Sequence, residues 1–138
     1  SEVFGARKES LPRLLRLEKE AKAKIDYDAM FAYLGEQLTH TDIEKLRKIL
    51  PDIMKEINAA LRELSLDAEA GLLIHISCCI DRLAKQEVAT NPRKAAILLQ
   101  YDKEFKKLLK IVKPLEKTFH VIINDDEIAN ILTIIYQL

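Results

Sequence analysis

The histidine and the arginine of the segment His75-Ile-Ser-Cys-Cys-Ile-Asp-Arg82 have a spacing that suits chemistry on an anion. Residues seven apart in an α-helix differ by about 20° around the helix axis and by roughly 10 Å along it. Both side chains therefore project from one face of a helix, about two turns apart. This pair predicts a place where an anion is received.

The same segment allows three other interpretations. His75, Cys78 and Cys79 have helical spacing for metal ligands, but structural zinc takes four ligands and no CxxC or HExxH pattern supplies the rest. A nucleophilic cysteine needs an accessible, electropositive setting, whereas Cys79 falls on the apolar face. A half-buried structural histidine with a hydrogen-bond partner stays open as an alternative. We predict no metal, no cofactor and no enzyme, since no glycine-rich phosphate loop or GxSxG elbow occurs either.

The segment belongs to a helix expected over residues 67–85, with Asp67 as its N-terminal cap. Its core-facing stripe is expected to consist of Leu72, Ile76, Cys79, Ile80 and Leu83. One flank of that stripe consists of Gly71, His75, Cys78 and Arg82. The small side chains on this flank leave the histidine in a shallow trough that another protein can enter.

The rest of the chain predicts more helices, because only three glycines and four prolines occur in a chain rich in helix-forming residues. The expected ranges are 10–24, 28–38, 42–49 and 51–64 (or one helix kinked at Pro51), 91–99, 102–116 and 126–138. Their predicted N-terminal signals are Thr41 or Asp42, Asn91 with Pro92, and Asp125. The segment His120-Val-Ile-Ile favours β structure but is too short to imply a sheet.

A basic stripe also recurs at helical spacing, and it consists of Lys106, Lys110, Lys113 and Lys117. We interpret it as a solvated face, with a docking surface for an acidic partner as the alternative. The whole chain carries 22 basic and 22 acidic side chains, so bulk charge predicts no direct binding to nucleic acid. Two adjacent cysteines cannot build a disulfide framework, which favours an intracellular, cytoplasmic protein.

The length of 138 residues suits one domain with one core. No apolar run is long enough to cross a bilayer, so we expect a soluble chain without membrane contact. It begins at Ser1 and shows no signal-peptide pattern, and we expect it to be part of a longer protein. Residues 1–27 are predicted to be an N-terminal linker or helical extension, and residues 28–138 the domain itself.

The run Gly71-Leu-Leu-Ile-His-Ile-Ser-Cys-Cys-Ile-Asp-Arg-Leu83 resembles the first histidine signature of the PTS regulation domain (PRD), in which an arginine follows the histidine by seven residues. Asn91-Pro92, then Phe105 with its lysine-rich helix, then Asp126-Glu127-Ile128 follow the order of that family. The sequence around His75 is most similar to the C-terminal PRD of LevR-like, sigma-54-dependent transcriptional activators.

This resemblance implies an all-α fold, a compact bundle of about five helices, often dimeric. It implies a regulatory domain of a bacterial transcriptional regulator of sugar operons, controlled when a PTS phosphocarrier, HPr or enzyme IIB, phosphorylates its histidine. His75 is then the phosphoacceptor and Arg82 the charge partner of the phosphate, unless Arg82 pairs with an acid from another helix. Ile74 replaces the usual aspartate and Ile134 occupies the second histidine's place, so His75 is expected to be the one regulatory histidine.

The residue chemistry is compatible with that role. A neutral imidazole is a good nucleophile toward phosphorus near neutral pH, and a guanidinium forms charge-assisted hydrogen bonds with phosphate. The competing prediction is a helical dimerisation or interaction domain that is never phosphorylated. A homodimer, which the family resemblance implies, is expected in either case.

Overall fold

The computed structural model describes residues 24–138, and every regular element within that range is an α-helix. The helices are α2 (Tyr27–Gln37), α3 (Ile43–Ala60), α4 (Leu66–Ala84), α5 (Lys94–Gln100), α6 (Asp102–Ile111), α7 (Lys113–Phe119) and α8 (Asp125–Tyr136). The prediction of an all-α bundle is confirmed. The linker helix predicted over residues 10–24 lies outside the described residues, apart from Lys24.

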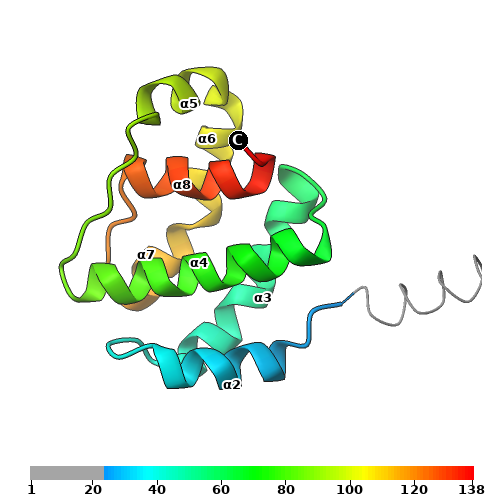
Figure 1. Cartoon of the computed structure of the whole chain (residues 1–138), viewed down its shortest axis with the longest axis vertical. Coiled ribbons are helices and arrows are strands. Elements are labelled where there is room, and N and C mark those ends of the chain that lie inside the picture. Colours follow the sequence, from blue (N-terminus) through cyan, green and yellow to red (C-terminus); the bar gives the residue numbers. More distant parts are fainter. Residues whose placement is uncertain (1–23) are drawn as a thin grey trace, which may run out of the picture.

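The helix that carries His75 lies at the centre of the bundle. Helix α4 packs against α8 on one side and against α2 and α3 on the other, and α5 and α6 cover the far side of α8 (Figure 1). One continuous apolar core joins these helices, and its largest fully buried side chains include Phe31, Leu50, Met54, Leu72, Ile80 and Leu108. Because α4 and α8 are both embedded in this core, the side chains at their interface are held firmly in place.

Helix α3 is continuous through Pro51, so of the two sequence alternatives the separate helices are wrong. The ring of Pro51 is half-buried, and the proline donates no backbone hydrogen bond. The flanking Leu46, Leu50, Ile53 and Met54 are all buried. Core packing on both sides of the proline therefore outweighs the local cost of placing it inside a helix.

Two predicted helix caps are wrong by one or two residues. Ser65, not Asp67, caps α4, because its hydroxyl accepts a hydrogen bond from the backbone N–H of Ala68 at 3.2 Å. Asn124, not Asp125, caps α8 by accepting from the N–H of Glu127 at 3.0 Å. In both cases acidic residues that were predicted to cap lie in the first turn instead, where the helix dipole favours them.

The helix predicted over residues 102–116 is divided at Val112 into α6 and α7. Pro114 explains the break, since it lacks the N–H that a continuous helix requires and its ring would clash with the preceding turn. The basic stripe is therefore shared by two helices, with its lysines exposed to solvent. Residues 121–124 form no strand and lead into α8.

The helix with Asn91 as its predicted cap and Pro92 in its predicted first turn begins later, at Lys94. The side chain of Asn91 accepts a hydrogen bond from the N–H of Arg93 at 2.8 Å and forms a turn rather than a helix cap. Its own N–H donates to Asp126, and its amide donates to Asn130. Asn91 thus fastens the loop between α4 and α5 to α8.

Candidate phosphoacceptor site

The apolar stripe predicted for α4 is buried as expected. Leu72, Ile76, Cys79 and Ile80 are each at most 1% exposed, while Leu83 is partly buried. His75 is half-buried at the edge of this stripe, next to the exposed Gly71 and the half-buried Cys78 on its flank. The flank predicted from helical spacing is therefore present, and His75 lies between core and solvent.

The imidazole of His75 has a nitrogen without a partner. Nε2 is buried and accepts or donates no hydrogen bond. Leaving such a group unpaired costs about 1–3 kcal/mol, so a histidine with a purely structural role would normally have a partner. Nε2 therefore lacks the hydrogen-bond partner that the structural alternative would give it.

Arg82 faces α8 and pairs with a buried carboxylate there. Its two terminal nitrogens donate to the two carboxylate oxygens of Glu127, at 3.2 and 3.4 Å. Glu127 is 0% exposed, whereas the Arg82 side chain is 30% exposed. The alternative in which Arg82 pairs with an acid from another helix is confirmed, and its fork-to-fork geometry is the strong form of such a pair.

Glu127 was not predicted as a site residue. The sequence did show it, as part of the Asp126-Glu127-Ile128 motif that opens the last helix. In the sequence, Asp125 is interpreted as the cap of this helix, and nothing there assigns a contact to Glu127. Only the packing of α8 on α4 brings Glu127 to Arg82, which is 45 residues away in the chain.

The electrostatics of His75 keep it neutral. Burial lowers the pKa of His75 below its ordinary value of 6.5, and the Arg82 guanidinium lowers it further, while the Glu127 carboxylate partly opposes the shift. Cys79, one turn along the helix, also feels Glu127, since burial first and then that carboxylate raise the pKa of its thiol. Cys79 is therefore a protonated core residue rather than a nucleophile.

Next to Arg82, the carboxylate of Asp81 faces the opposite way, toward the turn between α2 and α3. It is 5% exposed, and it accepts hydrogen bonds from the N–H of His40 at 2.7 Å, the hydroxyl of Thr41 at 2.8 Å and the N–H of Thr39 at 3.2 Å. Burial tends to raise the pKa of Asp81, but these hydrogen bonds and Lys85 outweigh it, and the pKa lies below 3.8. Asp81 thus links α4 to the turn between α2 and α3, and the adjacent Arg82 links α4 to α8.

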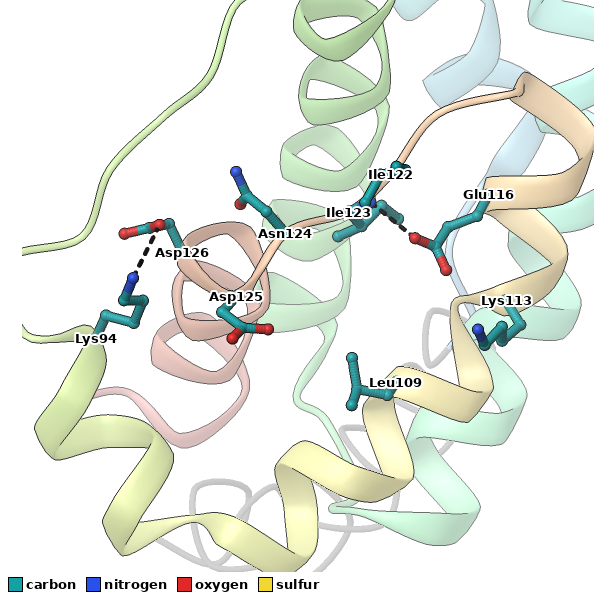
Figure 2. A pocket seen from close by; sticks show the side chains of 9 residues that line it. All are labelled: Lys94, Leu109, Lys113, Glu116, Ile122, Ile123, Asn124, Asp125 and Asp126. Atoms are coloured by element: carbon teal, nitrogen blue, oxygen red, sulfur yellow. Dashed lines mark hydrogen bonds and ion pairs between the residues drawn. The ribbon is translucent and has the colours of Figure 1, made fainter.

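A separate hollow of about 520 Å³ lies at the start of α8, among residues of α5, α6, α7 and the loop before α8 (Figure 2). Lys94 pairs with Asp126 across one edge, and the carboxylate of Glu116 accepts from the N–H of Ile123 at the other. His75 does not line this hollow. The hollow carries charged groups of both signs, and it is separate from the cluster of His75, Arg82 and Glu127.

The chain's two other histidines are not part of this cluster. His40 and His120 are exposed, and His120 ends α7 with a positive φ of 54°. Within residues 24–138, no three histidine, cysteine or acidic side chains are grouped so that they could hold a metal ion. The sequence-predicted pair of His75 and Arg82 does lie on one face, with Glu127 opposite.

Comparison with known proteins supports the resemblance stated from the sequence. The family model described as PRD domain matches residues 47–138, two thirds of the chain, and includes α4 and α8 entire. The chain belongs to the PRD family, whose members are PTS-regulated regulatory domains and not catalysts. No curated protein and no solved structure matches it. Among the described residues, none of the helices combines the length and apolar character that crossing a membrane requires.

Proposed function

We propose that this chain is the regulatory domain of a bacterial transcriptional regulator of sugar operons, switched by phosphorylation of His75. The phosphoryl donors are the PTS phosphocarriers, HPr or an enzyme IIB unit, which act in the cytoplasm. The observation that carries the proposal is the unpaired, neutral imidazole of His75 beside the Arg82 guanidinium, within a chain of the PRD family.

The chemical step is a phosphoryl transfer between two proteins. A lone pair of the neutral His75 ring forms a new N–P bond, while the bond between phosphorus and the carrier's nucleophile breaks and leaves its electron pair on the carrier. The other ring nitrogen of His75 then releases its proton to water. Because Nε2 makes no hydrogen bond, none has to be broken before it reacts, although its burial requires the ring to turn outward.

The result of that step is a large local change of charge. The new phosphoryl group brings close to two negative charges and three acceptor oxygens to the edge of the α4–α8 interface. Arg82 is the proposed group to receive them, since it lies on the same flank of α4 and its guanidinium acts to lower the pKa of His75. A packed interface responds to such a charge by shifting between two arrangements.

The finer parts of the proposal come from the sequence resemblance. The wording around His75 suggests a LevR-like, sigma-54-dependent activator, with the domain acting as a homodimer. Leu99 and Ile122 are 84% and 79% exposed, which is compatible with a surface that is covered by another chain. Ile134, in the place of a second histidine, is partly buried against the core, so His75 is the proposed single switch.

Labelling tests the proposal directly. The purified chain is incubated with labelled phosphoenolpyruvate, enzyme I, HPr and an enzyme IIB unit, and acid-labile phosphate is counted. We expect about one phosphate per chain for the wild type and none for His75→Ala. Absence of label on the wild type, or equal label on His75→Ala, would contradict the proposal.

The other two histidines are matched controls, because both are exposed and more accessible than His75. His40→Ala and His120→Asn should be labelled like the wild type. Asparagine is chosen at position 120 because it tolerates the left-handed conformation found there. Loss of label in either control would indicate that the substituted histidine, and not His75, is the phosphoacceptor.

The competing function is a dimerisation domain that is never phosphorylated. The exposed Leu99 and Ile122 are equally compatible with this function and with a phosphorylated dimer. Sedimentation equilibrium combined with the labelling experiment separates the two. A dimer whose His75 remains unlabelled with every carrier would establish the competitor.

A further inference from the structure

The most unusual group at this site is the buried carboxylate of Glu127. It is 0% exposed, and its N–H is held by the Asn124 cap, which fixes it in the first turn of α8. Both of its oxygens face the two terminal nitrogens of Arg82. A buried carboxylate is stable only with such a partner, because an unpaired charge in the interior is strongly unfavourable.

Three residues of α4, spread over about two turns, face this one carboxylate. His75, Cys79 and Arg82 follow one another at helical spacing, and Glu127 alters the pKa of the first two and pairs with the third. Among residues 24–138, Glu127 is the one acid within ion-pair distance of Arg82. The guanidinium is therefore already occupied before any phosphate arrives.

A phosphoryl group on His75 would compete for that guanidinium. It carries more charge than a carboxylate, and it would lie on the same side of α4 as Glu127. Arg82 is partly exposed and can turn, whereas Glu127 is fixed by its helix. If Arg82 turns to the phosphate, Glu127 is left buried, poorly paired and close to a second anion.

We infer that Glu127 is the positioning residue of the His75 site, because it holds Arg82 against α8 until phosphorylated His75 draws the guanidinium away and loosens the contact between α4 and α8. This inference rests on the proposed function, and it names the contact through which phosphorylation is transmitted. Glu127 touches no phosphate itself and acts through Arg82.

A comparison of wild type and Glu127→Gln tests the inference. The change in Tm on full phosphorylation is measured for both, with the phosphate verified by its 31P signal. Phosphorylation should lower the Tm of the wild type by about 5 °C or more, because it separates a buried ion pair. In Glu127→Gln no buried charge is abandoned, so the decrease should be less than half as large.

Asp126→Asn is the matched control. Asp126 is the adjacent residue on α8 and is also paired and hydrogen-bonded, but with Lys94 and Asn91 instead of Arg82. Its substitution should lower the Tm of both forms equally and leave the effect of phosphorylation unchanged. A merely structural role of Glu127 predicts that same result for Glu127→Gln, which would overturn the inference.

A second readout keeps Glu127 in place, in case Glu127→Gln does not fold. In a Cys78→Ser variant, the buried Cys79 beside Glu127 is the one remaining thiol. Phosphorylation should increase its rate of reaction with a thiol reagent by about tenfold or more, as the α4–α8 contact opens. An unchanged rate in a fully labelled protein refutes the inference alone, whereas failure of the wild type to be labelled refutes the proposed function.

Discussion

The reactivity proposed for His75 depends on three properties of one side chain. It is half-buried, its pKa is lowered by burial, and its Nε2 has no hydrogen-bond partner. A histidine in that state is neutral at physiological pH and retains an uncommitted nitrogen. The exposed His40 and His120 are not half-buried in this way, so the environment of His75 distinguishes it as the proposed acceptor.

The titration of His75 gives the first prediction. We expect the pKa of its imidazole to lie below 6.5 in the folded chain, and still lower in Glu127→Gln, because that substitution removes the carboxylate charge that favours the protonated ring. NMR observation of the ring proton resonances over a pH series measures both values. A midpoint at or above 6.5 in the wild type, or an upward shift in Glu127→Gln, would show that the ring is not in the described environment.

Asp81 supports the second prediction. Asp81→Asn should lower the free energy of unfolding by about 2–3 kcal/mol, because the carboxylate accepts hydrogen bonds from Thr39, His40 and Thr41 in a nearly buried setting. Urea denaturation measures the change. Asp52→Asn, at an exposed position of α3, is the control and should alter stability by less than about 0.5 kcal/mol. Equal effects of the two substitutions would contradict the role given to Asp81.

At the scale of the helix, α4 has a buried apolar face and, beside it, a flank that carries ionisable side chains. Its periodicity buries Leu72, Ile76 and Ile80, and the same repeat places His75 and Arg82 on one flank. Sequence was sufficient to predict this arrangement, since it follows from 3.6 residues per turn alone. It could not predict that Glu127 would face them, because that contact depends on how α8 packs.

Helix ends were less predictable than helix faces. Serine, aspartate and asparagine can all cap, and near the start of α4 both Ser65 and Asp67 were available. The choice is made by the backbone geometry at the turn, which only the folded structure shows. Similarly, Pro51 and Pro114 have opposite outcomes, one inside a helix and one just after a break, because strong core packing surrounds the first.

The caps of α4 give the third prediction. Ser65→Ala should lower the free energy of unfolding by about 1 kcal/mol, because it removes the acceptor for the N–H of Ala68. Asp67→Ala should cost only a few tenths of a kcal/mol, the usual effect of an acidic residue in the first turn of a helix. Chemical denaturation of both variants decides the matter. A larger loss of stability in Asp67→Ala than in Ser65→Ala would show that Asp67 is the cap.

At the scale of the whole molecule, the domain is a bundle in which α4 links two halves. Asp81 fixes it to the turn between α2 and α3, and Arg82 fixes it to α8. Two adjacent residues therefore hold opposite sides of the bundle. A change of charge at His75 is well placed to alter one of these contacts while the other persists.

The dependence of stability on pH is the fourth prediction. Because the folded pKa of His75 lies below 6.5, the unfolded chain binds a proton more readily, and stability should fall as the pH decreases through 6.5 toward the folded value. Asp81 affects stability in a more acidic range. Its pKa is depressed below 3.8, so its contribution to the free energy of unfolding is lost only as the pH falls below that value. As the pH is lowered through 6, the Tm of His75→Ala should therefore decrease less than the Tm of the wild type. Parallel curves for the two proteins would contradict this assignment.

The most direct test of the central claim is to locate the phosphate after incubation with the PTS phosphocarriers. The labelled chain is digested at alkaline pH, where phosphohistidine survives, and its peptides are sequenced by mass spectrometry. We predict a single phosphoryl group, carried by the peptide that contains His75. Phosphate on the peptide of His40 or His120, or on no peptide under conditions in which the carriers are themselves phosphorylated, would contradict the assignment of His75 as the switch.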